Sequence, residues 1–413
     1  MKKEVTYASV FAMREFRAMW LAELTSVAGD QLARVALAVL VYQRTASAGL
    51  TGLTYALTYL PSLVGGLLLS GLADRYPRRN VMIVTDLARV ALVAPMAIPG
   101  TPFWVLCVLL ALMVTLHGPF KAAQLAMLAD VLTGEKYVVG LAIRHITIQS
   151  AQLAGFAGGG ALVAFIGPST ALALNAATFA LSAGAVWWGV SHRPAARPKD
   201  RNGAVGTTAG GGMAVIWKDP VLRTLTLLAW LCGFHVTPEA LAAPYATSLG
   251  EGAVAVGLIM ASDPAGSVIG ALVFTRWVPS ERRVRLIGVL AVLAGIPLLF
   301  GFLYLPLVAS MALFALSGAF AMAYHTQLGA SFAQRIPDEV RAQGLGVMST
   351  GVITVQGLGA LAAGVLADAL GSGAAIALAG VAATLVAVPA AISWGRGWQD
   401  QGATIAAERP STG

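Results

Sequence analysis

The stretch Gly71-Leu-Ala-Asp-Arg-Tyr-Pro-Arg-Arg79 ends one long apolar segment of the chain and begins the next. Its two final arginines recur as Arg282-Arg283, at a distance of 204 residues (282 − 78). A short basic turn between two apolar segments is typical of a loop that joins two membrane helices. The stretch therefore predicts a membrane protein whose second half repeats the first.

The same spacing of 204 residues relates further identical residues in the two halves. These pairs are Gly29 and Gly233, Gly66 and Gly270, Gly140-Leu141 and Gly344-Leu345, Gln152 and Gln356, Gly155 and Gly359, and Gly160 and Gly364. One constant offset across a whole half indicates a duplication. Duplicated halves of membrane helices are typical of secondary transporters.

Apolar segments long enough to cross a bilayer, which takes about 20 residues, occur in both halves. In the first half they lie near residues 18–43, 48–73, 80–99, 102–128, 139–165 and 169–190. In the second half they lie near residues 221–247, 253–277, 285–303, 306–332, 343–367 and 373–394. Lipid offers no partner for unpaired backbone groups, so these segments must be helices. We predict an all-α polytopic membrane protein with about twelve transmembrane helices in two six-helix halves.

The composition agrees with a membrane protein, because 57% of the 413 residues are hydrophobic and only 11% are charged, against roughly 25% charged in soluble domains. The formal charge of +8 comes from basic residues in alternate loops. These are Arg75, Arg78, Arg79, Lys136, Arg193, Arg197, Lys199, Arg201, Lys218, Arg282, Arg283, Arg285 and Arg335. This positive-inside pattern predicts a multi-pass protein of the cell membrane with both termini in the cytoplasm. A nucleic-acid partner is not expected.

The predicted domains follow from the two halves and the longest polar segment between them. We expect an N-terminal six-helix half at residues 1–190, a cytoplasmic linker at 191–218, a C-terminal six-helix half at 219–395 and a cytoplasmic tail at 396–413. The linker contains a flexible glycine-rich stretch, Gly203 to Gly212. Two six-helix halves can enclose a path without a partner, so we expect a functional monomer in the lipid bilayer.

The loop at Gly71, Asp74, Arg75, Arg78 and Arg79 resembles the signature between the second and third helices of the major facilitator superfamily. Pro77 stands where that family commonly has glycine. The resemblance covers essentially the whole chain and implies two halves, each built from inverted repeats of three helices. The sequence on either side of this loop also resembles that of the family's drug-exporter and siderophore-exporter branches. This loop has two interpretations. It could be a conformational latch, in which Asp74 contacts the other half of the protein, or only an anchor that fixes the topology. In both, the arginines hold the loop at the cytoplasmic face.

The fifth predicted span contains Gly155-Phe-Ala-Gly-Gly-Gly160, which is similar to the antiporter signature of the export branches. Gly155, Gly159 and Gly160 match it, whereas Phe156 replaces a proline. Small residues at this spacing also allow two helices to approach closely. Close packing and an export signature are therefore both interpretations of these glycines.

Ionisable side chains inside the membrane are costly, roughly 2.5–3.5 kcal/mol each on insertion scales, and are therefore candidates for function. Asp30 and Arg34 lie near the middle of the first span and share a helix face. They could neutralise each other, or Asp30 could couple proton and substrate occupancy through Arg34. The family's exporters often use acids of the first helix in this way. We expect Asp30 and Arg34 to take part in proton coupling.

The second half contains corresponding polar residues. His235 and Glu239 are four residues apart in the seventh span, and Asp263 precedes Pro264 in the eighth. Glu239 and Asp263 are candidates for a second protonation site, although Glu239 could be a neutral buried acid. Asp263 could also cap a broken helical turn.

Candidate substrate-cavity residues are polar or aromatic side chains of the spans. We expect them to be Tyr59, His117, Lys121, Phe234 and His235. Lys121 and His117 could bind an anionic solute or pair with an acid such as Asp30 or Asp130, and the aromatic rings could instead lie at a membrane interface.

Other charged groups are expected to have structural roles or to lie in solvated positions. Asp86 and Arg89 are expected to form an ion pair, and Glu23 and Arg144 to lie near the cytoplasmic mouth, where solvation makes charge inexpensive.

These features predict proton-coupled export of hydrophobic or amphipathic small molecules such as antibiotics, secondary metabolites or siderophores. A proton-coupled importer or a facilitator is the alternative. No zinc-binding His-Glu-x-x-His motif and no phosphate-binding G-x-x-x-x-G-K-[ST] loop occurs in the sequence. We therefore expect neither an enzyme nor a cofactor or metal site, and protons as the partner that supplies energy.

Overall fold

The computed structural model describes residues 6–194 and 211–407, and in these ranges the regular secondary structure is helical. The described residues form two compact units. The first unit contains residues 6–194 and Ala242–Ala261, and the second contains residues 211–241 and 262–407. The domain bounds proposed from the sequence stay a prediction.

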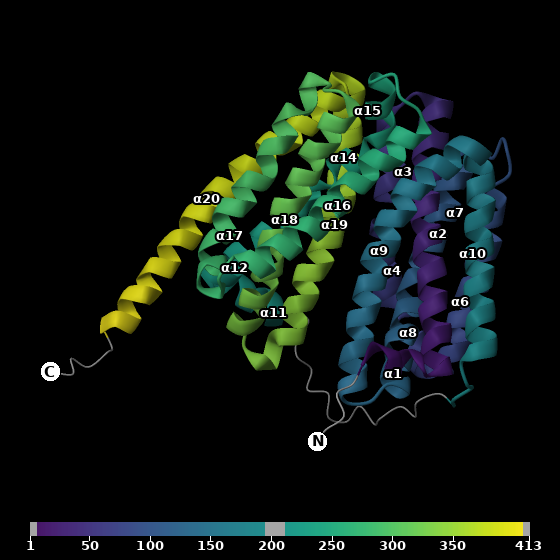
Figure 1. The fold of residues 1–413 in the computed structure, drawn as a ribbon, viewed down its shortest axis with the longest axis horizontal. Helices are drawn as coiled ribbons and strands as arrows, with labels where there is room; N and C mark the ends of the chain where they lie inside the picture. The colour runs from purple at the N-terminus through teal and green to yellow at the C-terminus, as the bar shows by residue number, and fades with distance from the viewer. Residues whose placement is uncertain (1–5, 195–210, 408–413) are drawn as a thin grey trace. The chain divides into compact units, whose positions relative to one another are not determined.

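The first unit is a bundle around the long helix α2. Its helices before residue 195 are α1 (Tyr7–Phe11), α2 (Arg14–Thr45), α3 (Ala48–Ala56), α4 (Leu60–Leu69), α5 (Leu72–Arg75), α6 (Arg78–Met96), α7 (Phe103–Thr115), α8 (His117–Val131), α9 (Glu135–Ile166) and α10 (Pro168–Gly189). Helix α15 (Ala242–Ser248) and the first turns of α16 (Ala253–Trp277) belong to the same unit. Helix α2 packs against α9 and α10, and α10 packs against α6, as Figure 1 shows.

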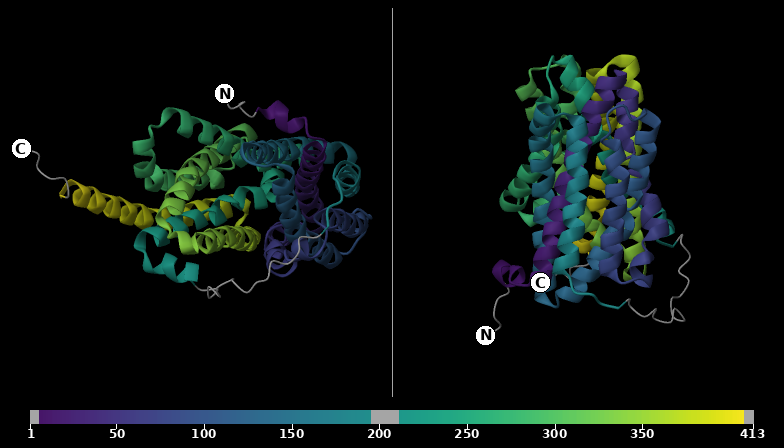
Figure 2. Two further views of the ribbon diagram at one scale, coloured as in Figure 1. Left: turned by 90° about the horizontal axis from the view of Figure 1, so that it is seen from below. Right: turned by 90° about the vertical axis from the view of Figure 1, so that its right-hand side faces the viewer.

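The second unit is also helical. Its elements are α11 (Gly211–Lys218), α12 (Pro220–Trp230), α13 (Cys232–His235), α14 (Thr237–Ala240), the later turns of α16, α17 (Ser280–Gly295), the 3₁₀ helix η1 (Ile296–Leu303), α18 (Leu307–Arg335), the 3₁₀ helix η2 (Asp338–Val340), α19 (Arg341–Leu370) and α20 (Ser372–Ala407). Helix α17 packs against α18 and α20. Figure 2 shows the helices of this unit from two further directions. Helix α11 lies in the predicted linker, whose residues 195–210 are outside the described ranges.

Ten helices or helix runs of the described chain are long and apolar enough to cross a membrane. Helices α6 and α9 occupy the remaining predicted segments, near residues 80–99 and 139–165. Both are long, but charged residues such as Arg89 in α6 and Arg144 in α9 lower their hydropathy. The prediction of an all-α membrane protein with about twelve spanning helices is confirmed.

Several predicted spans are divided into shorter helices, and the span at residues 221–247 is divided most. Residues 221–247 form α12, α13, α14 and α15 instead of one continuous helix. Pro238 and Pro244 lie in this segment, and proline removes a backbone donor and disfavours an uninterrupted helix. The short helices α13 and α14 contain His235 and Glu239.

The spacing of 204 residues recurs in the packing of the two units. A Cβ atom on Gly140 would meet Leu132, and a Cβ atom on Gly344 would meet Ile336. Both the glycines and their neighbours differ by 204 residues (344 − 140 and 336 − 132). The turn that precedes α9 is therefore packed in the same way as the turn that precedes α19.

A second packing contact has the same relation. Gly155 of α9 lies against α2, close to the carbonyl oxygen of Ala28, and Gly359 of α19 lies against the carbonyl group of Gly233 in α13. Gly29, the neighbour of Ala28, corresponds to Gly233 by the same offset (233 − 29). The duplication therefore extends to the contacts between helices within each unit.

Candidate functional site

The centre of the candidate site in the first unit is a contact between α2 and α8. Nε2 of His117 lies 3.1 Å from Oδ2 of Asp30. Both side chains are partly buried, with 31% and 18% of their surfaces exposed. In the described part of the chain, Oδ1 of Asp30 has no hydrogen-bond partner. An acid and an imidazole, each able to exchange a proton, are thus joined by one hydrogen bond.

Arg34 lies one helical turn after Asp30 and packs against aromatic rings. Its guanidinium carbon is 5.0 Å from the ring centre of Tyr59 and 5.9 Å from that of Tyr55. Such contacts attract a cation to the face of a ring. Arg34 acts electrostatically on Asp30, and the side chain of Asp30 forms a hydrogen bond with His117.

A fully buried ion pair on α6 lies near this contact. Nη1 of Arg89 is 3.2 Å from Oδ1 of Asp86, and neither side chain is exposed. Arg89 also donates to the carbonyl oxygen of Leu116 at 3.1 Å, and the hydroxyl of Ser182 donates to Oδ2 of Asp86 at 2.6 Å. The expected ion pair therefore connects α6 with α10 and with the residue before α8.

Two phenyl rings enclose the buried guanidinium. The guanidinium carbon of Arg89 lies 4.7 Å from the ring centre of Phe120 and 5.3 Å from that of Phe179. Arg89 acts electrostatically on both Asp30 and His117. A change in the charge of the Asp30–His117 pair would therefore change its electrostatic interaction with Arg89.

Sequence reasoning gave too little weight to a second charged cluster on α2. Glu23 is buried, and Nε of Arg144 donates to its carboxylate at 2.6 Å. Arg144 also donates to the side chain of Gln124 at 3.1 Å. Lys121 is exposed and acts electrostatically on Glu23. The spacing of Glu23 and Asp30, seven residues or two helical turns, could have indicated that both acids share a face of α2.

The second unit brings together the acids that were expected there. Glu239 and His235 are buried on α14 and α13, and Glu239 acts electrostatically on Asp263 of α16. Asp263 lies against Gly318 of α18. Within the described residues, neither ring nitrogen of His235 has a hydrogen-bond partner. Phe234, next to His235, packs against the apolar core of this unit.

The signature loop is tied to its own unit by arginines. Arg78 forms an ion pair with Asp130 at the end of α8. Arg79 donates to the carbonyl oxygen of Trp187, and its guanidinium carbon lies 5.2 Å from the centre of the Trp187 ring. These contacts join the start of α6 to α8 and α10.

The other loop positions have fewer constraints. Asp74 and Arg75 are exposed, and a Cβ atom on Gly71 would meet no neighbour within 4 Å. The contact of Asp74 with the other half stays a prediction.

The glycines of α9 face other helices of the first unit at very short distance. A Cβ atom on Gly155 would come within 2.8 Å of Cβ of Gln31, and one on Gly159 within 3.5 Å of Leu32. A Cβ atom on Gly160 would come within 2.8 Å of Cα of Gly257 in α16. These contacts support the packing interpretation, while a role as an export signature stays a prediction.

The predicted site residues thus gather in two places, one in each unit. Asp30, Arg34, His117 and Tyr59 lie together in the first unit. His235, Glu239 and Asp263 belong to the second unit. Among residues 6–194 and 211–407, no three metal-binding side chains are placed to hold an ion.

Comparison with known proteins gives consistent results over most of the chain. The family model described as Major Facilitator Superfamily matches residues 19–307. The multidrug efflux pump Tap of Mycobacterium tuberculosis (strain ATCC 25618 / H37Rv) is 28% identical over 385 residues, which are 89% of this chain and 91% of the relative. Tap of Mycolicibacterium fortuitum is 26% identical over 369 residues, 85% of this chain and 88% of that protein.

Solved structures of transporters have a similar fold. A bacterial homolog of the human lysosomal transporter Spinster, inward-facing and occupied, gives a TM-score of 0.72 at 14% identity and covers 92% of this chain and 95% of its own. A bacterial homologue of the iron transporter ferroportin, inward-facing, gives a TM-score of 0.68 at 16% identity and covers 92% of this chain and 98% of its own. At these identities the likeness concerns the fold.

Proposed function

The chain belongs to the Major Facilitator Superfamily, and from this membership we propose that it exports hydrophobic or amphipathic small molecules in exchange for protons. It is a multi-pass membrane transporter. The relatives at 28% identity are named as multidrug efflux pumps, which supports export of drug-like compounds. The two halves would alternate in access around a site near the bilayer midplane, in the cell membrane and with both termini in the cytoplasm.

The observation that carries the proposal is the hydrogen bond between Asp30 and His117. An ionised Asp30 can accept a hydrogen bond from Nε2 of His117, whereas a proton on Asp30 weakens that contact. Protonation would thereby loosen α8 from α2, and a solute would bind when the proton leaves. Movement of one charge through 100 mV supplies about 2.3 kcal/mol, and that energy would drive export.

Glu239 and Asp263 supply a second place for a proton in this proposal. Two neighbouring carboxylates repel each other when both are ionised, so such a pair tends to retain one proton. The electrostatic interaction of Glu239 with Asp263 supports this role. Protons could then be exchanged in both units during one cycle.

The aromatic residues of the two clusters suit an apolar or amphipathic solute. Tyr59 lies beside Arg34 in the first unit, and Phe234 lies next to His235 in the second. Binding pockets for such molecules combine apolar walls with a few polar groups. We propose Tyr59, His117, Lys121, Phe234 and His235 as residues of the substrate cavity.

The test uses purified protein in liposomes that contain a pH-sensitive dye. We expect hydrophobic cations, macrolides or siderophores to trigger proton flux, and Asp30→Asn to abolish it. Asp368→Asn, the same chemical change at an exposed position of α19, serves as the control and should transport normally.

Other outcomes would revise the proposal. Proton flux that persists in Asp30→Asn but is lost in Glu239→Gln or Asp263→Asn would place the coupling proton in the second unit. Solute and proton movement in the same direction would identify an importer. Solute counterflow without any proton flux would contradict coupling and indicate a facilitator.

A further inference from the structure

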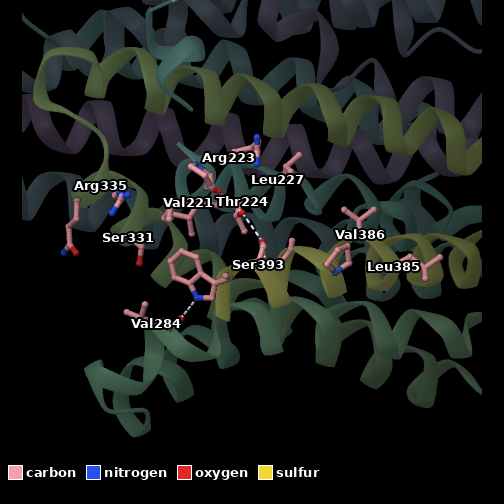
Figure 3. A pocket seen from close by; sticks show the side chains of 16 residues that line it. Val221, Arg223, Thr224, Leu227, Val284, Ser331, Arg335, Leu385, Val386 and Ser393 are labelled. Carbon is pink, nitrogen blue, oxygen red and sulfur yellow. Dashed lines mark hydrogen bonds between the residues drawn. The ribbon is translucent and has the colours of Figure 1, made fainter. Parts of the chain in front are cut away.

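The second unit contains a pocket of about 730 Å³ that no step of the proposed transport cycle uses, shown in Figure 3. Its walls come from α12, α17, α18 and α20. Arg335 and Ser331 lie at one end, Leu385 and Val386 lie at the other, and Arg223 and Leu227 lie between them. The volume lies within the range of about 300–1,000 Å³ that is usual for small-molecule sites.

With the topology predicted from the sequence, the pocket extends from the cytoplasmic membrane surface into one leaflet. Pro220 is the first residue of α12, Arg335 is the last of α18, and Val284 lies in the first turns of α17. The basic loops predicted from the sequence place these helix ends at the cytoplasmic face. From Pro220 to Leu227 the helix rises by about 10 Å, so the apolar part of the pocket lies at the depth of acyl chains.

Two arginines give the pocket its charge. Nε of Arg335 donates to Oδ2 of Asp219 at 2.9 Å, which orients the guanidinium and leaves its terminal amino groups as further donors. Arg223 is exposed, and no ion pair to it is recorded among the described residues. Two guanidinium groups line the pocket and, in the described part of the chain, only that of Arg335 is paired with a carboxylate, so the lining carries a net positive charge.

The walls of the pocket are fixed by contacts between helices. The indole nitrogen of Trp394 in α20 donates to the carbonyl oxygen of Val284 at 2.9 Å. The hydroxyl groups of Thr224 and Ser393 lie 3.2 Å apart and join α12 to α20, as the dashed lines in Figure 3 show. A preformed pocket loses little conformational entropy when a ligand binds.

We propose that this pocket binds an anionic phospholipid of the cytoplasmic leaflet. The anionic headgroup would lie between Arg335 and Arg223, and an acyl chain would lie along Leu227, Leu385 and Val386. Basic pockets between membrane helices on this side of the bilayer suit anionic headgroups. A free phosphate would leave the apolar walls unused, and a neutral apolar solute would leave both guanidinium groups without a partner.

The test compares phosphatidylglycerol with phosphatidylcholine of the same acyl chains, added to the purified full chain in detergent. Bound lipids are counted by native mass spectrometry, and the melting temperature is measured in parallel. We expect phosphatidylglycerol to bind at least about tenfold more tightly and to raise the melting temperature. A tenfold difference in affinity corresponds to the free energy of about one charge-assisted hydrogen bond.

Variants separate the two parts of the site. Arg223→Gln should weaken phosphatidylglycerol binding about tenfold, and Arg223→Lys should retain most of it. Val386→Trp, which fills the apolar part, should weaken binding with both arginines present. Arg276→Gln removes an exposed arginine of α16 that does not line the pocket, and should bind as the parent does.

Three results would overturn the proposal. The first is equal binding of both lipids by the parent, or equal binding by the Arg223→Gln and Arg276→Gln proteins. The second is stabilisation by inorganic phosphate alone to the same extent, which would indicate a simple anion site. The third is displacement of phosphatidylglycerol by a transported solute with loss of transport in Val386→Trp, which would assign the pocket to substrate entry.

Discussion

Charged side chains within the membrane bundles are stabilised by specific partners. Asp86 and Arg89 illustrate this, because neither is exposed and each has a further polar contact, with Ser182 and the carbonyl oxygen of Leu116. An isolated buried charge would cost far more than the attraction gained in a surface pair. Whether a charged side chain can be buried therefore depends on the partners it contacts rather than on its residue type.

Removal of one partner of this pair should be more harmful than removal of both. We expect Arg89→Leu to lower the free energy of unfolding by about 3–5 kcal/mol, because Asp86 is then buried without its cation. The double variant Asp86→Leu, Arg89→Leu should lose less than Arg89→Leu alone. Unfolding of the purified proteins in mixed micelles measures both values, and additive losses would contradict the expected coupling.

Outside the membrane, Asp219 provides a prediction that depends on pH. Burial acts to raise its pKa, but hydrogen bonds from Arg335 and from the amides of Val221 and Leu222 outweigh burial and hold the pKa below its usual 3.8. A lowered pKa in the folded state contributes stability that is present above the unfolded pKa and is lost as the pH falls through the folded pKa.

We therefore expect Asp219→Asn to melt at a lower temperature than the parent at pH 7. Asparagine still caps the helix, so the difference reports mainly the charge. The difference should shrink as the pH falls below about 3.8, and melting curves from pH 7 to pH 3 measure it. A difference that does not change with pH would show that the charge of Asp219 does not matter.

At the scale of helices, glycine determines which elements approach closely. On α9, Gly155 lies against α2, whereas a Cβ atom on Gly158 would meet nothing within 4 Å. The two positions are three residues apart on one helix, so their intrinsic helix propensity is the same. They therefore separate the effect of packing from that of propensity.

We expect Gly155→Ala to destabilise the protein by about 1–3 kcal/mol, because the new methyl group must push Gln31 away. Gly158→Ala should be neutral or stabilise by up to about 1 kcal/mol. Thermal unfolding and proton flux of both variants provide the comparison. Equal behaviour of the two variants would contradict close packing of α9 on α2.

On the scale of the whole molecule, the duplication and the basic loops predict the orientation in the membrane. Glu251 lies in a loop predicted to be outside, and Asp338 in one predicted to be inside; both are exposed. In a background without Cys107 and Cys232, an impermeant thiol reagent applied to intact cells should label Glu251→Cys. It should label Asp338→Cys only after the cells are permeabilised, and the reverse pattern would invert the topology.

Much of this protein could be predicted from its sequence because the bilayer imposes simple rules. Length and hydropathy predicted the spanning segments, and the offset of 204 residues predicted a duplication, to which the similar contacts of Gly155 and Gly359 correspond. The basic loops predict which side of the membrane each loop faces. A segment in lipid must form all its backbone hydrogen bonds within itself. Whether it is a helix therefore depends mainly on its local sequence.

Only the tertiary structure decided which charges meet. Asp30 and Arg34 are four residues apart, yet Asp30 forms its hydrogen bond with His117, 87 residues away in the sequence. Arg34 packs on tyrosines, and Glu23 is buried against Arg144. Spacing along one helix shows which side chains share a face, but the partner comes from whichever helix packs there. That choice depends on contacts between distant segments, which no local pattern specifies.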